Sequence, residues 1–125
     1  MDNNAQHSHE KRQFTRVAFV NRISLVQQPL QWQGNVVDIS FNGVLINCNL
    51  HDINLQQSIT GHIVFETREQ ISVTLQHIHH YNNLWGFQFD RIEQKSLECL
   101  NRLMAEHLST DACQRELKAL FSYHQ

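Results

Sequence analysis

Two short polar motifs hold the residues whose types and spacing could form a binding site. The first is R-x-x-x-R, formed by Arg12 and Arg16, and the second is D-x-S-x-x-G, formed by Asp38, Ser40 and Gly43. A guanidinium group is a planar, permanently charged fork that binds a phosphate, or the O6/N7 edge of guanine, through two hydrogen bonds. A carboxylate is an acceptor for N–H donors. The two motifs therefore offer chemistry for a small anionic ligand.

Each motif also has a plainer interpretation when it is taken alone. Two arginines four residues apart commonly mark a solvated surface. The D-x-S-x-x-G pattern is common in turns, where Asp and Ser bond the local backbone and Gly supplies a left-handed residue. Their order is more specific, because the arginine pair directly precedes the first predicted strand and the turn follows the second. The four-residue spacing points both arginine side chains the same way in extended or helical chain.

Short strands are predicted through most of the chain that follows the arginine pair. Residues 71–76 alternate strictly between apolar and polar side chains, as in a half-buried strand. Pro29 lies in the first turn and keeps the chain there out of a helix. Six short strands separated by turn residues predict a closed or nearly closed antiparallel barrel. The predicted strands cover residues 14–25, 32–39, 44–48, 59–67, 71–76 and 85–89.

The apolar spacing becomes helical after residue 89. Asp90, with Glu93 three residues later, resembles an N-cap and predicts a helix start. A second helical stretch is expected to start at Ser109 or Thr110. We expect the apolar stripes to pack against the barrel, and a partner-binding groove is the alternative. The stripes contain Leu97, Leu100, Leu103, Met104 and Leu108, and then Leu117, Leu120 and Phe121.

Length and composition indicate one small folded domain. The chain has 125 residues, of which 41% are hydrophobic, and this is enough for a single core. We divide it into a flexible N-terminal arm at 1–11, a barrel domain with its helix at 12–108, and a C-terminal helical extension at 109–125. A formal charge of −2 argues against binding long nucleic acid by bulk charge.

The expected location is the cytoplasm. The first residues contain no apolar run of the kind found in a secretory signal, and nowhere do about 20 apolar residues occur together as a membrane span would need. The three cysteines are far apart and odd in number, which favours reduced thiols. We expect a monomer that does not associate with a membrane.

The order of the motifs resembles the PilZ domain family. That family typically has an R-x-x-x-R arm, a [D/N]-x-S-x-x-G turn, and a late strand of the Gly-aromatic-x-Phe kind followed by a helix. The late strand here contains Gly86-Phe87-Gln88-Phe89. The resemblance covers roughly residues 10–108, and the two C-terminal helical stretches are similar to the stand-alone, single-domain bacterial members. It implies a mainly β protein, a six-stranded antiparallel barrel with C-terminal α-helices, that binds the second messenger cyclic di-GMP.

The resemblance also implies roles for the motif residues. Arg12 and Arg16 would bind the phosphates and guanines of the ligand. Asp38 would accept from the N1–H and N2–H₂ donors of guanine. Ser40 could donate to a phosphate or accept from a base, and Gly43 would let the backbone approach the ligand.

Two further residues are candidate ligand contacts. Lys11 could add charge near the phosphates, although it could equally be an exposed lysine in a tail. His77 lies where close relatives carry an aromatic residue that stacks on guanine, and the alternative is an ordinary histidine at a strand end. Gln13 stands in a stretch where many relatives have a third arginine. The number of ligand molecules, one or an intercalated pair, therefore stays open.

Metal binding and catalysis have little support in the sequence. His77 and His79 could share a strand face and bind a metal, but no Cys or acidic residue is spaced locally to complete a site. No nucleophile elbow, H-E-x-x-H or glycine-rich phosphate loop occurs. We therefore expect no metal, no cofactor and no enzymatic activity.

The resulting expectation is a sensor that acts through an effector protein. The arm would be mobile without ligand, and cyclic di-GMP would draw it over the barrel beside Asp38 and Ser40. One alternative is a PilZ-fold adaptor that does not bind the nucleotide. Another is a small barrel for single-stranded nucleic acid, which the acidic charge balance and the few aromatics expected at the surface argue against.

Overall fold

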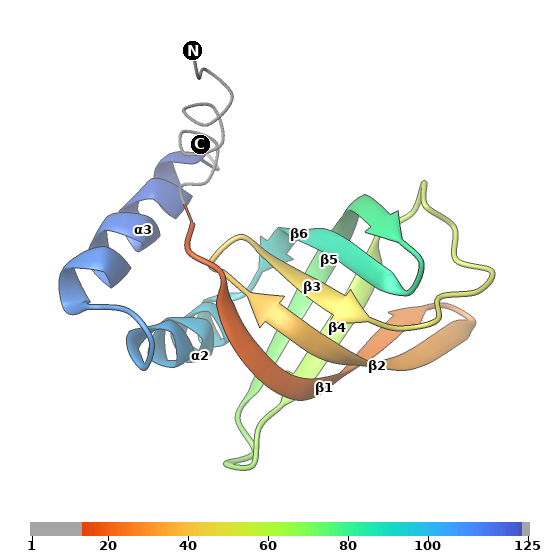
Figure 1. Ribbon diagram of the computed structural model, residues 1–125, viewed down its shortest axis with the longest axis horizontal. Helices are drawn as coiled ribbons and strands as arrows, with labels where there is room; N and C mark the ends of the chain where they lie inside the picture. The colour runs from red at the N-terminus through yellow and green to blue at the C-terminus, as the bar shows by residue number, and fades with distance from the viewer. Residues whose placement is uncertain (1–13, 124–125) are drawn as a thin grey trace.

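The computed structural model describes residues 14–123, and its ribbon is shown in Figure 1. The predicted arm at 1–11, with Lys11, and also Arg12 lie outside the described residues. The described part contains six strands and two helices. They are β1 (Val17–Gln27), β2 (Leu30–Ile39), β3 (Gly43–Asn47), β4 (Ile59–Val64), β5 (Gln70–Tyr81), β6 (Leu84–Ile92), α2 (Gln94–Ala105) and α3 (Thr110–Tyr123).

The strands close into a barrel in the order β1-β2-β3-β6-β5-β4, and each neighbouring pair is antiparallel. The closure between β1 and β4 is short, because only Ser24–Val26 pair with Thr60–His62. The predicted six-stranded antiparallel barrel with C-terminal helices is confirmed. Closure leaves an inner face for the core and an outer face for other contacts.

Alternation along the strands places the apolar side chains inside the barrel. In β5, Ile71, Val73 and Leu75 are buried, as the strict alternation of residues 71–76 predicts. The strand continues to Tyr81, beyond the predicted end, because it stays paired with β6 up to a two-residue turn. Asn82 in that turn has a φ of 54°, a left-handed conformation that Asn tolerates better than most residues. The long β5–β6 hairpin carries several histidines.

The two helices begin differently from each other. The predicted N-cap at Asp90 is wrong, because β6 runs on to Ile92 through pairing with β5, and Glu93 becomes the N-cap without a side-chain hydrogen bond. The predicted start of the second helix is confirmed. The Ser109 Oγ accepts a hydrogen bond from the Ala112 N–H at 3.1 Å, as an N-cap does.

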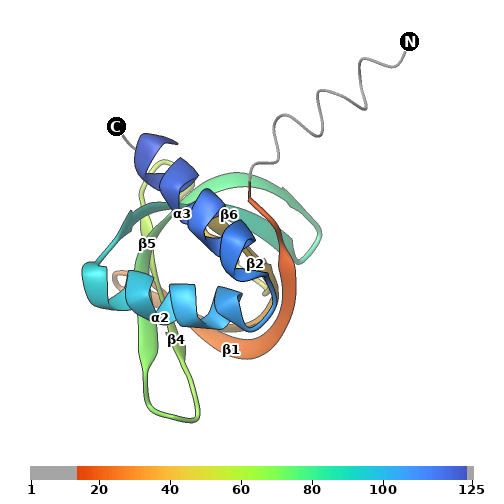
Figure 2. The same cartoon turned by 90° about the vertical axis from the view of Figure 1, so that its left-hand side faces the viewer.

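Both helices lie at the end of the barrel where β1 begins (Figures 1 and 2). Helix α2 packs on β5, and α3 packs on α2. The apolar stripe of α2 is buried, as predicted, and so is Leu120 of α3, whereas Phe121 is 54% exposed and does not join the core. The buried residues of α2 are Ser96, Leu97, Cys99, Leu100, Leu103 and Met104.

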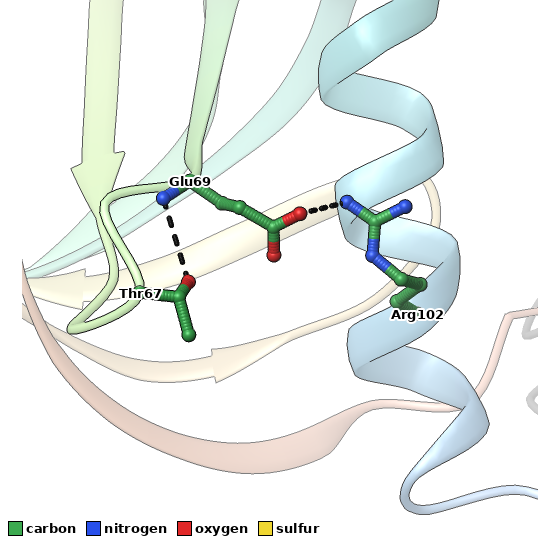
Figure 3. A network of polar contacts seen from close by, with 3 residues as sticks. All are labelled: Thr67, Glu69 and Arg102. Atoms are coloured by element: carbon green, nitrogen blue, oxygen red, sulfur yellow. Dashed lines mark hydrogen bonds and ion pairs between the residues drawn. The ribbon is translucent and has the colours of Figure 1, made fainter.

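Polar contacts fix α2 against the β4–β5 hairpin (Figure 3). Arg102 of α2 forms an ion pair with Glu69 in the turn, and the Glu69 N–H donates to the Thr67 hydroxyl at 3.4 Å. The Ser72 N–H donates to the Ser96 hydroxyl at 2.8 Å. Both charged side chains are about half exposed, so the ion pair contributes at most ~1 kcal/mol to stability. The helix is held chiefly by its apolar face.

All three cysteines, Cys48, Cys99 and Cys113, are free and buried. Burial raises the pKa of each thiol, which keeps the thiols protonated and poorly nucleophilic at neutral pH. Within residues 14–123, neither helix has the length and apolar character needed to cross a membrane.

Candidate functional site

A pocket of about 430 Å³ lies on the outer face of the barrel. Arg16, Asp38, Ser40 and Gly43 all line it, so the structure brings together four of the predicted site residues. Gly86 and Gln88 place it on the outer face, because they alternate along β6 with Trp85, Phe87 and Phe89, which belong to the buried core. The remaining lining residues are Phe14, Asn42, Val44, Leu45, Ile78, His79 and Phe87.

The turn between β2 and β3 is shaped by its own hydrogen bonds. The Ser40 N–H donates to the Gly43 carbonyl at 2.9 Å, and the Ser40 hydroxyl donates to the Asn42 Oδ1 at 2.8 Å. The Asn42 N–H in turn donates to the Ser40 Oγ at 3.2 Å. Phe41 is completely buried and anchors the turn to the core. Ser40 is thus a buried residue that sets the shape of the pocket edge.

The expected role of Gly43, to let the backbone approach a ligand, stays a prediction. The plainer interpretation, a left-handed turn glycine, is wrong, because all four glycines lie in the described part of the chain and none has a positive φ. Instead, a Cβ at Gly43 would lie 2.5 Å from the Phe87 carbonyl oxygen of β6. The missing side chain lets β3 and β6 pair closely and leaves open backbone at the pocket floor.

His77 lies outside the lining of this pocket. Its ring contacts Trp85 and Phe87, with centroids 5.6 and 6.2 Å away, and its Nε2 lies 3.0 Å from the His80 Nδ1. Burial, with smaller contributions from His80 and His79, lowers the pKa of His77. His77 therefore belongs to a cluster of rings at one end of the hairpin.

The pocket instead contains His79, which the sequence reasoning did not select. The pairing of β5 with β6 shifts register between His77 and His79, so Ile78 is an extra residue in β5. Simple alternation would have put both histidines on one face, and the bulge turns them to different faces. The predicted possibility of a shared metal site on them is not supported, and residues 14–123 hold no group of three potential metal ligands.

The segment just before β1 is bonded to helix α3. The Thr15 N–H donates to the Glu116 Oε1 at 3.0 Å, and the Thr15 hydroxyl donates to the Glu116 Oε2 at 2.6 Å. Glu116 is buried on α3, and Phe14 is buried beside this segment. Since Arg16 follows Thr15 directly, one carboxylate connects the arginine motif to the C-terminal helix.

Comparison with known proteins is consistent with this architecture. The profile of the PilZ domain family matches residues 10–106. The PilZ domain of CeSA from a cellulose-synthesizing bacterium has a TM-score of 0.61 at 15% identity, and the match covers 74% of this chain and 99% of that chain. The Bacillus subtilis inhibitor of motility, MotI/DgrA, has a TM-score of 0.58 at 15% identity, with 78% and 53% covered. An uncharacterized Legionella protein has a TM-score of 0.50 at 19% identity, with 74% and 96% covered. None of the curated proteins matches the sequence.

Proposed function

Because the chain belongs to the PilZ domain family, whose members generally bind cyclic di-GMP, we propose that it is a cyclic di-GMP sensor that acts on an effector protein. The observation that carries the proposal is a single pocket lined by Arg16, Asp38 and the open backbone of Gly43. The guanidinium group of Arg16 can donate two hydrogen bonds to a phosphate or to the guanine O6/N7 edge. Asp38 supplies an acceptor for the guanine N1–H and N2–H₂ groups.

The arginine arm would complete the site from the N-terminal side. Arg12 precedes Arg16 by four residues, a length of chain that reaches at most ~14 Å when extended. Fixing the arm costs about 1–2 kcal/mol per residue in backbone entropy. Charge-assisted hydrogen bonds from Arg12, and added charge from Lys11, would offset this at about 1.5–3 kcal/mol per bond. The ligand would thus order the arm over the pocket.

The bond between Thr15 and Glu116 offers a route from the arm to the surface of α3. A change at Arg16 must be accommodated by Thr15, and the carboxylate that holds Thr15 is part of α3. Ligand binding would therefore alter the surface formed by α3 and the start of β1. We propose that an effector protein recognises this altered surface.

The remaining properties follow from the same proposal. PilZ domains are typically non-enzymatic ligand-binding or adaptor domains, and we assign no reaction to this chain. The proposed sensor is a cytoplasmic bacterial monomer, with three reduced and buried thiols. It works with a small nucleotide and one protein partner, without binding long nucleic acid.

The test is calorimetric titration of cyclic di-GMP into the wild type, Arg16→Ala and Asp38→Ala. Arg22→Ala and Asp111→Ala are matched controls, because these exposed residues lie outside the pocket lining. We expect affinity to fall at least about tenfold in both site variants, equivalent to ~1.4 kcal/mol, and to stay unchanged in both controls. Added salt should weaken binding by the wild type, because it screens the ionic contacts.

The same titration gives the number of ligand molecules bound per chain. Undiminished binding by Arg16→Ala would contradict the proposed arginine contact. A folded wild type that takes up no ligand would contradict the sensor itself and would leave an adaptor that works without the nucleotide.

A further inference from the structure

His79 lies at the opposite end of the pocket from Asp38. The register of the sheet places Asp38 opposite Leu45, Leu45 opposite Gly86, and Gly86 opposite His79. These four residues form one row across β2, β3, β6 and β5, and all of them line the pocket. Because neighbouring strands are about 4.8 Å apart, the backbones of Asp38 and His79 are separated by ~14 Å along this row.

The imidazole of His79 is directed back along the row toward Asp38. A Cβ built on Gly86 would lie 2.5 Å from the His79 Cε1 and 2.9 Å from its Nδ1, so the ring occupies the space that a side chain at Gly86 would fill. The bulge at Ile78 turns His79 to this outer face, and the glycine makes room for its ring there. The ring therefore covers part of the pocket floor and remains exposed to a ligand.

The middle of the row is nearly free of polar side chains. Leu45 is half-buried and the His79 ring covers Gly86, so a base or ribose could lie over Leu45, between Asp38 and that ring. Asp38 and His79 are then the two polar ends of the row. A guanine held by Asp38 leaves the His79 end to another part of the same ligand.

We propose that His79 is a further ligand contact, which donates a hydrogen bond to an acceptor atom of the cyclic dinucleotide at the end opposite Asp38. This inference rests on the proposed function. A cyclic dinucleotide offers phosphate oxygens and the O6/N7 edge of its second guanine, and all of these are acceptors. An imidazole carries at least one N–H in every protonation state that occurs near neutral pH, so it can donate to either kind of atom.

The experiment compares cyclic di-GMP binding by five variants of the full chain with binding by the wild type. His79→Phe keeps a ring and removes both nitrogens. His79→Asn and His79→Gln restore an N–H donor near the positions of Nδ1 and Nε2. His77→Phe tests the histidine that the sequence favoured, and His107→Phe is a matched control on an exposed histidine outside the pocket. A thermal melt of each variant establishes that it is folded.

We expect His79→Phe to bind cyclic di-GMP about tenfold more weakly than the wild type, which corresponds to ~1.4 kcal/mol. At least one of His79→Asn and His79→Gln should bind within about threefold of the wild type, a difference of ~0.65 kcal/mol. His77→Phe and His107→Phe should bind as the wild type does.

Wild-type affinity in His79→Phe, or equal losses in His79→Phe and both donor variants, would overturn the proposed hydrogen bond. A loss confined to His77→Phe would overturn the assignment to His79. In each of these cases the wild type still binds, and the sensor function stands. If the folded wild type does not bind cyclic di-GMP, both proposals fail.

Discussion

Gly43 and Gly86 form the backbone floor of the pocket, and each faces an atom that a Cβ would meet at 2.5 Å. The two contacts differ in how easily the opposing atom could move away from an added Cβ. At Gly43 the opposing atom is the Phe87 carbonyl oxygen, which the paired strands hold in place, whereas at Gly86 it belongs to the ring of an exposed histidine. A side chain at Gly43 would therefore have to displace β3 from β6.

For Gly43→Ala we expect the free energy of unfolding to fall by about 1–3 kcal/mol, as for other overpacked sites. Asn47→Ala is the matched control, because it adds alanine at an exposed position of the same strand. Urea denaturation of both variants and the wild type measures the difference. A Gly43→Ala protein as stable as the control would show that the close approach of β3 and β6 is not required.

The motif D-x-S-x-x-G could be identified from the sequence, but the physical role of its glycine could not. Residue spacing alone favours a left-handed glycine in such a turn. The close approach of the Phe87 carbonyl oxygen depends on which residue of β6 lies opposite Gly43, and that register is set by the whole barrel. Likewise, the Ser40 hydroxyl is engaged by its own turn, which only the folded geometry reveals.

At the scale of the elements, a single extra residue in β5 decides which histidine reaches the pocket. Alternation and turn residues predict all six strands, but β5 and β6 extend beyond their predicted ends because they stay paired with each other. The bulge at Ile78 changes neither composition nor hydrophobicity, so the sequence predicts His77 and the structure places His79 in the pocket. For a similar reason the N-cap was misplaced at Asp90, since pairing with β5 extends β6 beyond it.

The bond between α3 and the segment before β1 is also an element-scale feature, since it joins residues 101 positions apart. For Glu116→Ala we expect a loss of about 1–3 kcal/mol in the free energy of unfolding, because two hydrogen bonds to a buried carboxylate are removed. Glu106→Ala removes an exposed glutamate just after α2 and serves as the control.

Thr15→Val removes only the hydrogen bond from the Thr15 hydroxyl and should lower the free energy of unfolding by about 1 kcal/mol. Urea denaturation measures all three variants, and a Glu116→Ala loss no larger than that of the control would contradict the proposed coupling.

At the scale of the whole molecule, the closed barrel uses its inner face for the core and its outer face for the candidate site. The inner face needs only apolar side chains of suitable size, which is consistent with a similar fold in proteins that share 15% of their residues with this chain. The outer face supplies Asp38 from β2 and His79 from β5, and the segment just before β1 supplies Arg16. The barrel could therefore be predicted from periodicity and Arg16 and Asp38 from their motifs, whereas the place of His79 depends on a register that only the structure defines.

The stability of the whole protein should fall in mild acid because of His77. Burial among Trp85, Phe87 and His80 lowers the pKa of His77 in the folded state, so the unfolded chain binds a proton there more readily. The free energy that His77 contributes is thus fully present above the ordinary pKa of 6.5 and is lost as pH falls below that value toward the lowered pKa of the folded state. Urea denaturation between about pH 8 and about pH 5 should show a steeper loss of stability in the wild type than in His77→Phe, which keeps a ring and cannot titrate. His107→Phe is the control and should follow the wild type, whereas parallel curves for the wild type and His77→Phe would show that burial at the hairpin does not disfavour the imidazolium.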